Sequence, residues 1–379
     1  MKGIRVGMLM GRARADVLVF GATGFTGRLV CEALRARGIA FAVAGRNRSK
    51  LDALSRALGG VETAVVDLKD AETIVRALGD RRVVCACAGP FIEVGEPILA
   101  SCARMGIHYA DTTGEQSFVA LAVLRYRATA EASGACIAPS MAYEIAPADW
   151  AAHVAAERVG GAPERLDIVY MPGEGGSLVD TTTRGTKLSV MSIFAGESRQ
   201  FVDGALRREA PATVVQTFDT LDGRRVTALS IPSPETIVVP GHTGARTVRT
   251  FMTMGRGPAR LLQKTRSFAP AAVRLARPLL ARAIGRSSEG PEGEARAMPF
   301  HLLAEAHRAG RTARVFVSGR DPYGLTAEIQ ALYVARALAG ALEVRGIVAP
   351  SQAIAPRDAM EALRPSGLEL AIFDNGSPI

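Results

Sequence analysis

A glycine-rich turn near the amino terminus constrains the fold more than any other feature of this chain. Gly21-Ala22-Thr23-Gly24-Phe25-Thr26-Gly27 follows the apolar segment 16–20 and opens a helical pattern that ends near residue 37. In such a GxxGxxG turn, Gly21 allows the tight turn, Gly24 lets backbone N–H groups approach a pyrophosphate, and Gly27 lets the helix pack against the strand. Glycine-rich turns also serve as plain connections. The position between strand and helix nevertheless predicts a dinucleotide site that includes Thr23, Phe25 and Thr26.

Helix and strand patterns then alternate through the first 150 residues. Strand patterns cover residues 16–20, 40–44, 61–66, 82–88, 108–111 and 135–139, and helical patterns cover 24–37, 49–58, 71–78, 96–105 and 118–132. Short apolar strands separated by helices of this length predict a parallel sheet covered on both faces. We therefore expect an α/β fold with a Rossmann doubly wound sheet, which binds its ligand at the carboxyl ends of the strands.

The second predicted strand ends without an acidic residue. Enzymes that use NAD usually place Asp or Glu there to hold the ribose 2′-hydroxyl, but this chain continues with Arg46-Asn47-Arg48. Arg46 offers a charge-assisted pair to a 2′-phosphate, worth about tenfold to a hundredfold in affinity. We therefore predict NADPH as the cofactor, with these three residues around the phosphate; a solvated basic loop is the alternative. Asp67 should lie near the adenine edge or cap a helix.

The alternation weakens beyond residue 150. Segments 166–170, 212–218, 225–230 and 311–319 have strand patterns, and 325–342 and 357–363 have helical patterns. We expect a disordered leader at residues 1–15, an NADP-binding Rossmann domain at 16–150, and a second α+β domain for substrate binding or dimerisation at 151–324. The helices of residues 325–379 should return to the first domain, with the active site in the cleft between the domains.

Residues 88–115 contain a more specific pattern. Ala88-Gly89-Pro90-Phe91 follows the fourth predicted strand, and Tyr109-Ala110-Asp111-Thr112-Thr113-Gly114-Glu115 follows at the fifth. With the glycine-rich turn, these segments resemble the amino-terminal domain of the saccharopine dehydrogenase-like reductases. The resemblance implies an NADP-binding domain in which residues 88–91 lie along the nicotinamide side of the cofactor. It also assigns Asp111 to the cofactor and Thr112 and Glu115 to the substrate, although Asp111 and Glu115 could mainly order the turn.

The resemblance becomes more selective farther along the chain. Residues 141–149 resemble the family's G-F-D-x-x-P-S-D stretch, with Ala142, Tyr143 and Glu144 replacing Gly, Phe and Asp. Residues 183–186 and 319–327 are similar to elements of the trans-acting enoyl reductases of lipid and polyketide synthesis, one branch of the family. This branch implies hydride transfer from NADPH to an unsaturated acyl thioester, either small or bound to an acyl carrier protein. Tyr143 would be proton donor or oxyanion partner, and Arg184 would give electrostatic support; a packed Tyr and a surface Arg are the plain alternative.

Two other functions fit the same residues. Reduction of an imine formed from an amino acid and a keto acid would need paired cations for the substrate carboxylates, which Arg184 and Lys187 could supply. A non-catalytic NADP sensor or scaffold is compatible with the altered Tyr143-Glu144 segment. Assays with NADPH and panels of enoyl thioesters, imines and keto acids would separate the three.

Cysteine content and hydropathy indicate the compartment. The five cysteines are scattered, mostly inside apolar runs, which suits reduced thiols better than disulfides or a metal site. No apolar run approaches the roughly 18 residues that span a bilayer, and the amino terminus lacks the apolar stretch of a secretory signal. We expect a cytoplasmic protein, with peripheral contact to a membrane as an option.

The net charge of +9 is concentrated in one part of the chain. Residues 236–288 contain ten Lys or Arg and no acidic residue, and we call residues 246–286 the basic zone. Zinc-finger spacing and an aromatic RNA-binding signature are missing from the sequence, so we expect no nucleic-acid partner. Within the zone, residues 269–286 predict an amphipathic helix interrupted by Pro278. It could be a solvated face, a docking surface for an acidic carrier protein or a homodimer partner, or a contact with an anionic membrane; Pro278 favours docking of a carrier.

Overall fold

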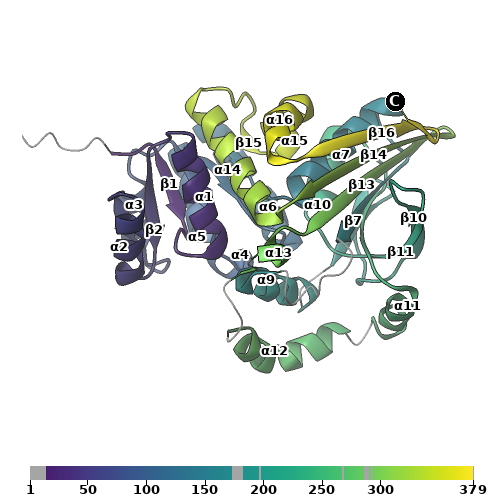
Figure 1. The fold of residues 1–379 in the computed structure, drawn as a ribbon, viewed down its shortest axis with the longest axis horizontal. Helices are drawn as coiled ribbons and strands as arrows, with labels where there is room; N and C mark the ends of the chain where they lie inside the picture. Colours follow the sequence, from purple (N-terminus) through teal and green to yellow (C-terminus); the bar gives the residue numbers. More distant parts are fainter. Residues whose placement is uncertain are drawn as a thin grey trace, which may run out of the picture.

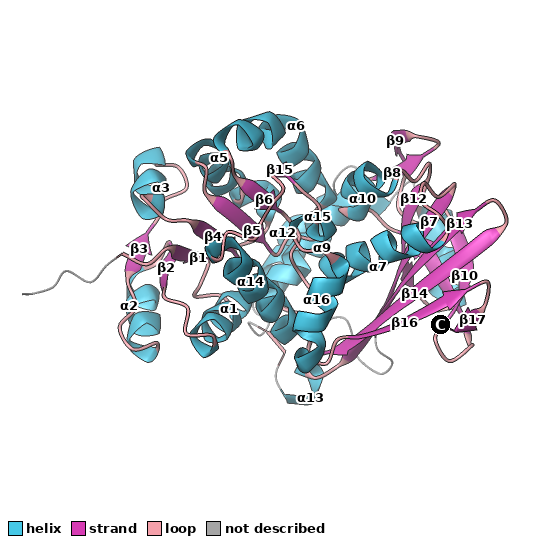
Figure 2. Ribbon diagram, turned by 90° about the horizontal axis from the view of Figure 1, so that it is seen from above, coloured by secondary structure: helices cyan, strands magenta, loops and turns pink. Residues whose placement is uncertain are grey.

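The computed structural model describes residues 14–172, 182–195, 198–266, 269–285, 290–291 and 293–378. Two sheets lie side by side with helices between them (Figures 1 and 2). The first is wholly parallel and the second is mixed, so the predicted fold class is confirmed. No helix in the described ranges is both long and apolar enough to cross a membrane.

The first sheet has the strand order β15-β6-β5-β4-β1-β2-β3, which is the Rossmann arrangement with one added strand. Its strands are β1 (Val17–Phe20), β2 (Phe41–Gly45), β3 (Thr63–Val65), β4 (Val83–Ala86), β5 (His108–Asp111), β6 (Cys136–Ala138) and β15 (Gly346–Ile347). Its helices are α1 (Phe25–Ala36), α2 (Arg48–Ala57), α3 (Ala71–Leu78), α4 (Phe91–Val94), α5 (Glu96–Met105), α6 (Gln116–Ser133) and α14 (Pro322–Leu338). The strand order reverses between β1 and β4, so a ligand is expected at the carboxyl ends of these two strands.

Both faces of the first sheet are buried, as its apolar strands require. Val17 and Val19 of β1 face a core formed with α1, α2 and α14, while Leu18 and Phe20 face a core formed with α3, α5 and α6. Successive strand residues point to opposite faces, so one four-residue strand anchors two helical layers. α14 comes from the far end of the chain and packs against α1, β4 and β5.

The second sheet has the order β10-β11-β12-β7-β13-β14-β16-β17, with β8 and β9 beside β12. Its strands are β7 (Arg165–Pro172), β8 (Arg199–Val202), β9 (Ala205–Arg208), β10 (Val215–Asp219), β11 (Arg225–Ser230), β12 (Val248–Thr253), β13 (Pro299–Arg308), β14 (Arg311–Arg320), β16 (Glu369–Asp374) and β17 (Ser377–Pro378). The other helices are α7 (Ile145–Arg158), α9 (Arg184–Ala195), α10 (Glu235–Thr243), α11 (Arg256–Thr265), α12 (Ala269–Gly285), α13 (Gly293–Arg296), α15 (Pro350–Ala353) and α16 (Pro356–Leu363). α7 lies on β13 and β14 and joins the two sheets.

Four expectations about segments need correction. The boundary drawn at residue 150 cuts α7 in its middle, where Trp150 is fully buried and donates from Nε1 to the Ile354 carbonyl at 3.1 Å. Residues 325–379 do not all return to the first domain, because β16 pairs with β14 of the second sheet.

The other two corrections concern the chain start and Pro278. Residues 1–13 of the expected leader lie outside the described residues, but Arg14 is tied to α3 through the Ala77 carbonyl at 3.2 Å. α12 continues through Pro278 instead of stopping there. Pro removes one internal hydrogen bond and normally costs about 3 kcal/mol inside a helix, but it need not end one.

Candidate functional site

Two glycines of the glycine-rich turn are required by packing. Gly21 has φ of +80°, and a Cβ there would lie 2.8 Å from both Cβ and N of Ala88. A Cβ on Gly27 would lie 2.8 Å from Cα of Ala22 and closer still to the Gly21 carbonyl oxygen. These contacts bring β1, α1 and the end of β4 together at the point where the strand order reverses.

Gly24 is different, because it faces outward. It is exposed, and a Cβ there would meet only the Gly21 carbonyl oxygen, at 3.4 Å. It is the N-cap of α1 and makes no side-chain cap, while the first-turn N–H groups of any helix lack intrahelical acceptors and carry partial positive charge. An open, backbone-lined, positive end of this kind fits a pyrophosphate.

The flanking residues of the turn divide into two groups. Thr23 and Thr26 are half-buried beside Gly24. The ring of Phe25 instead stacks edge-on with Tyr323, with 5.3 Å between centroids, and lies against Gly290. Phe25 therefore connects the turn to the second half of the chain, and only its backbone N–H remains suited to the cofactor.

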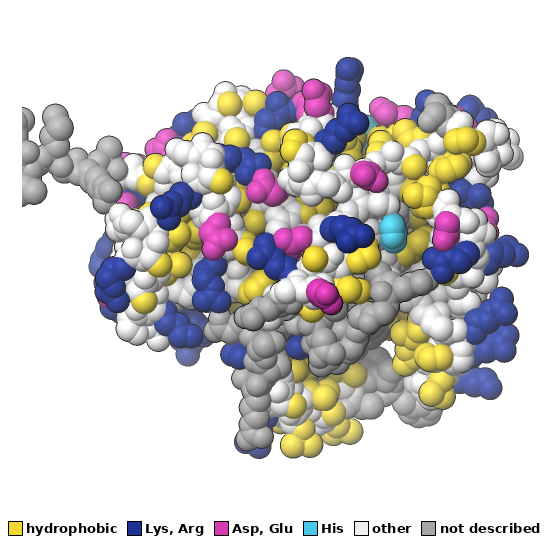
Figure 3. Space-filling model, viewed as in Figure 1, with side chains coloured by type: hydrophobic (Ala, Val, Ile, Leu, Met, Phe, Trp, Pro, Cys, Tyr) yellow, Lys and Arg dark blue, Asp and Glu magenta, His cyan; other side chains and the backbone are white. Residues whose placement is uncertain are grey.

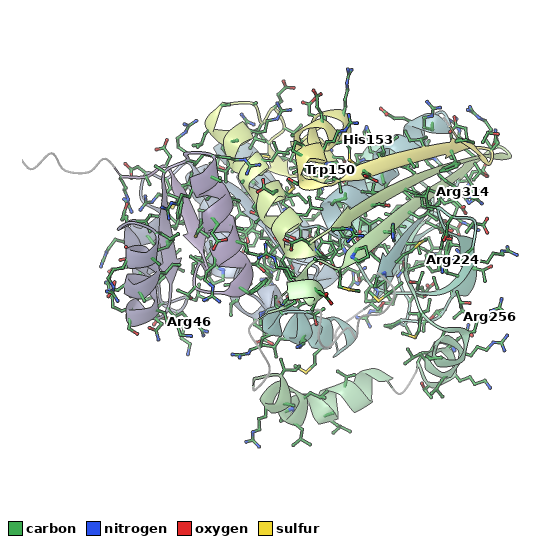
Figure 4. All side chains as sticks on the ribbon, viewed as in Figure 1. Arg46, Trp150, His153, Arg224, Arg256 and Arg314 are labelled. Carbon is green, nitrogen blue, oxygen red and sulfur yellow. The ribbon has the colours of Figure 1, made fainter. Side chains whose placement is uncertain are left out.

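The basic residues after β2 also have different environments. Asn47 caps α2, since its Oδ1 accepts from Lys50 N at 3.0 Å and from Ser49 Oγ at 2.8 Å. Arg48 lies 3.9 Å from Asp52. Arg46 is exposed at the edge of the first domain (Figure 4), and we find no hydrogen bond or ion pair to it from the described part of the chain. Of the predicted phosphate ligands, Arg46 is thus the one whose guanidinium is available.

Asp67 has a local role in the structure. Its Oδ1 accepts from Lys69 N at 3.0 Å, and Asp70, not Asp67, is the N-cap of α3. The side chain of Asp67 is exposed. Its contact with the adenine edge stays a prediction.

Glu115 holds the turn formed by residues 88–91. Its Oε1 accepts from Phe91 N at 2.8 Å and its Oε2 from Ile92 N at 3.0 Å, and the residue is buried. Phe91 is itself buried and packs against Phe118. With both carboxylate oxygens on backbone N–H groups, Glu115 fits the ordering role better than substrate contact. The backbone of Ala88, Gly89 and Pro90 is what this turn offers to a cofactor.

Asp111 fastens the carboxyl ends of β5 and β6. Its Oδ1 accepts from Thr113 N at 2.9 Å and from Ser140 N at 2.8 Å, and burial raises its pKa to about 7. Gln330 of α14 donates to the backbone carbonyls of Asp111 and Met141, both at 2.9 Å. Thr112 is half-buried beside Asp111. The predicted nicotinamide end of the site is therefore rigidly braced.

Tyr143 and Glu144 lie where the two sheets meet. The ring of Tyr143 packs edge-on against Phe300 at 5.1 Å, and its backbone N–H donates to Thr326 Oγ1 at 3.1 Å. Glu144 points toward Gly114, since its Oε1 would lie 3.5 Å from a Cβ built there. In the described ranges we find no hydrogen bond to the Tyr143 hydroxyl and none to the Glu144 carboxylate from another residue.

Both residues are half-buried, and this partial burial makes the two groups chemically distinct. It raises the pKa of Tyr143 well above its ordinary value and the pKa of Glu144 to about 7. Tyr143 therefore stays protonated and can donate a hydrogen bond at any ordinary pH. Glu144 can both give up and regain a proton near neutrality.

A second carboxyl with a raised pKa, Glu235, is fully buried at the start of α10, beside Tyr170 of β7. Glu235 accepts hydrogen bonds from the hydroxyls of Tyr170 and Ser233, which are themselves 3.0 Å apart. Burial raises the pKa of Glu235 to about 7, and the charge of Glu144 is among the causes that raise the pKa of Tyr170. We call Tyr143, Glu144, Tyr170, Ser233 and Glu235 the seam cluster.

Sequence reasoning missed most of the seam cluster. For Glu144 the sequence holds a signal, since Tyr143-Glu144 departs from the family's Phe-Asp pair, although the site prediction names only Tyr143. Tyr170 lies on β7, whereas Ser233 and Glu235 lie at the start of α10. No motif links these positions, and only the fold brings them together.

Arg184 and Lys187 lie in the first turn of α9 and are half-buried. The neighbouring Thr183 and Thr186 contact the hydroxyl of Tyr323, through Thr183 N at 2.8 Å and Thr186 Oγ1 at 3.2 Å. The start of α9 is thus fixed to α14, beside the ring that covers Phe25. Direct contact of Arg184 or Lys187 with a substrate stays a prediction.

Two further charged groups are structural. His242 Nε2 lies 2.7 Å from Asp149 Oδ1; burial opposes charge on both groups, but their mutual attraction raises the pKa of His242 and lowers that of Asp149. This pair ties α10 to α7. On the second sheet, Asp167, Glu305 and His307 offer ligand atoms within 4.8 Å of one another, but Arg165 and Arg314 already pair with the two carboxylates.

Comparisons with known proteins agree with this geometry. Residues 17–138 match the family model described as the saccharopine dehydrogenase NADP binding domain. A Mycobacterium tuberculosis protein provisionally named a trans-acting enoyl reductase is 36% identical over 160 residues, which cover 40% of this chain and 38% of the relative. The trans-acting enoyl reductase of Mycobacterium leprae is 34% identical over 140 residues, covering 35% and 34% of the two chains.

Two more comparisons extend beyond the mycobacterial relatives. The human saccharopine dehydrogenase-like oxidoreductase is 29% identical over 187 residues, which cover 44% of each chain. The matched region thus spans less than half the length of each of these curated relatives. The solved structure of apo saccharopine dehydrogenase (L-Glu forming) from Saccharomyces cerevisiae matches with a TM-score of 0.64 at 12% identity, covering 95% of this chain and all of that one. That likeness concerns the fold.

Proposed function

We propose that this chain, whose amino-terminal domain belongs to the saccharopine dehydrogenase NADP binding family, is an NADPH-dependent reductase of unsaturated acyl thioesters. The family match identifies an NADP binding domain, and the relatives named as trans-acting enoyl reductases suggest the substrate class. The observation that carries the proposal is the juxtaposition of Tyr143 and Glu144 at the seam between the two sheets. Neither side-chain group makes a hydrogen bond to another described residue, and both residues are half-buried, which raises the pKa of each.

The residues of the first domain would hold the cofactor. Gly24 and the first-turn N–H groups of α1 would receive the pyrophosphate, Arg46 the 2′-phosphate, and the backbone of residues 88–90 the nicotinamide side. When bound, NADPH would supply the hydride that the β-carbon of the substrate accepts.

The seam cluster would complete the reduction. The Tyr143 hydroxyl donates a hydrogen bond to the thioester carbonyl and stabilises the negative charge that develops there. The protonated Glu144 then gives its proton to the α-carbon, so that the double bond gains one hydride and one proton. The resulting carboxylate regains a proton from solvent, which a pKa of about 7 permits near neutral pH.

The test is turnover of NADPH with a trans-2-enoyl thioester by the full chain. Glu144→Gln should lower kcat by about 10²- to 10⁴-fold while NADPH affinity stays unchanged. Because the acid must be protonated, the wild-type kcat should fall as the pH rises through about 7. Glu361→Gln, at an exposed site on α16, is the control. An unchanged kcat in Glu144→Gln would remove Glu144 from the mechanism.

One observation keeps imine reduction as a second candidate. Arg184 and Lys187 share the first turn of α9, on the element that contacts Tyr323, and could pair with substrate carboxylates. Imines formed from an amino acid and a keto acid should then be reduced faster than enoyl thioesters, and Arg184→Ala should raise KM selectively. Binding of NADPH without turnover of any substrate class would instead favour a sensor or scaffold.

A further inference from the structure

Two leucines of α12 are exposed to solvent and do not contribute to the buried core. Leu275 is 83% exposed and Leu279, one turn later, is 71% exposed. Val273, Ala276 and Ile284 of the same helix are only half-exposed, and α12 packs against α9. Figure 1 shows α12 as an outlying helix below α9, and Figure 3 shows hydrophobic side chains gathered at that end of the molecule.

α11 extends the same character along the chain. Leu261 is 63% exposed and Leu262 37% exposed, beside exposed Arg260 and Lys264. Single exposed apolar residues are ordinary on a protein surface, but several large ones on two consecutive helices indicate a contact surface. We call the exposed leucines of α11 and α12, together with Arg260, Lys264 and Arg282, the leucine–arginine face.

The charge of this region limits what can cover the face. α11 and α12 contain no acidic residue, and Arg260, Lys264 and Arg282 on them are exposed. A second copy meeting this face with the same face would bring cations against cations, with no carboxylate from the two helices to compensate. A neutral partner would leave the cations without counter-charges. The sequence pattern therefore calls for an anionic partner.

We propose that the leucine–arginine face binds the surface of an anionic membrane, with the leucines inserted into the acyl boundary and the cations among the lipid headgroups. An acidic carrier protein would satisfy the cations, but leucines that protrude with 71–83% exposure would need matching apolar pockets on it. A lipid surface accepts protruding apolar side chains without such a match, and each nearby Lys or Arg adds about 1 kcal/mol of attraction to anionic lipid. Pro278 is itself exposed and apolar and lies on the same helix, so it does not interrupt the face.

The test is sedimentation of the full chain with vesicles of phosphatidylcholine alone and of equimolar phosphatidylcholine and phosphatidylglycerol. Binding should require the anionic lipid and weaken with added salt. The double variant Leu275→Ser, Leu279→Ser should bind about tenfold more weakly or worse. Leu124→Ser, which removes an 85% exposed leucine from α6, should bind like the wild type. Unchanged NADPH affinity will show that the variants are folded.

A second variant separates charge from apolar contact. Reversal of Arg260, Lys264 and Arg282 to Glu should abolish the preference for anionic vesicles, whereas Arg207→Glu, at an exposed site on β9, should not. Equal binding to both vesicle types, or none to either, would overturn the proposal. So would a dimer that dissociates when the leucines are replaced, which would assign the face to a second copy. A rise in KM confined to carrier-bound substrate, without vesicle binding, would assign it to an acidic carrier protein.

Discussion

The glycine-rich turn and the seam cluster are built in opposite ways. The turn is seven consecutive residues in which two glycines are fixed by contacts with backbone atoms and one is left open. The seam cluster draws its side chains from the start of α7, from β7 and from the start of α10. The turn uses backbone groups and almost no side-chain chemistry. The cluster consists of two carboxyls and three hydroxyls, and we find no cation hydrogen-bonded to them in the described part of the chain.

The difference shows where each kind of function is encoded. A phosphate needs N–H groups and space, which a short glycine pattern specifies locally. A proton donor with a raised pKa needs burial, and burial depends on everything packed around it. The first can be read from a segment, and the second is a property of the assembled fold.

The largest expected effect separates the glycines within the turn. Gly27→Ala forces a Cβ into the Gly21 carbonyl and the Ala22 backbone, so we expect a loss of about 3 kcal/mol or more in the free energy of unfolding. Gly24→Ala should leave that free energy within about 1 kcal/mol but weaken NADPH binding by about tenfold or more, because its Cβ enters the pyrophosphate space. Urea unfolding and calorimetry measure the two effects. Equal free energies of unfolding for the two variants would contradict the different roles given to Gly27 and Gly24.

The second-largest expected effect is a change of stability with pH, caused by Glu144 of the seam cluster. Burial raises the pKa of Glu144 from 4.5 to about 7, so between these values the folded state holds a proton that the unfolded state has released. Stability should therefore fall as the pH rises across this window, by up to about 3 kcal/mol for this group. Glu144→Gln should remove that part and be more stable than the wild type above pH 7.

A control variant and the other buried carboxyls define how much of the pH dependence of stability belongs to Glu144. Glu361→Gln, at an exposed site, should follow the wild-type curve at every pH. Part of the slope should remain in Glu144→Gln, because burial also raises the pKa values of Asp111 and Glu235 to about 7. Wild-type and Glu144→Gln stability curves that run parallel from pH 4 to pH 8 would show that Glu144 does not titrate as the structure implies.

The smallest effect concerns cofactor choice. Arg46 is available for a 2′-phosphate, so NADPH should bind at least about tenfold tighter than NADH, and Arg46→Ala should erase most of that gap. Arg48→Ala is the matched control, because Arg48 already contacts Asp52 and Thr63. Calorimetry with both cofactors measures the gap. Equal affinity of the unmutated protein for NADPH and NADH would contradict the assignment.

The sequence predicted the first sheet well because its strands are short, apolar and buried on both faces. β1, β4 and β5 fall within two residues of the predicted ranges at each end. Strands β12 and β13 were missed, because buried charged residues break their apolar patterns. Glu305 of β13 is neutralised by Arg314, and Arg249 of β12 pairs with Glu209. A sequence pattern cannot show such partners, since they come from other segments of the chain.

The candidate site could be predicted from the sequence only in part. The turn, Arg46 and the Gly-Pro-Phe segment could be proposed from their positions after strands, and their contact with a cofactor stays a prediction. The roles of Glu115 and Asp67 were less predictable, because carboxylates that bind backbone N–H groups have the same appearance in a sequence as those that face a ligand. Glu235 could not have been found without knowing that α10 lies beside β7.

The path of the chain between the two sheets has a mechanical consequence. The backbone passes from the first sheet to the second through α7, returns through α14 to β15, and passes again through α15 and α16 to β16. Three covalent connections therefore bridge the same seam, and the Asp149–His242 pair adds a non-covalent tie beside one of them. Two bodies joined by one linker can twist, slide or swing, but three linkers leave little except a swing about an axis that passes near all three. Any opening of the seam should thus follow a single hinge path, and closure should return Tyr143 and Glu144 to the same place each time.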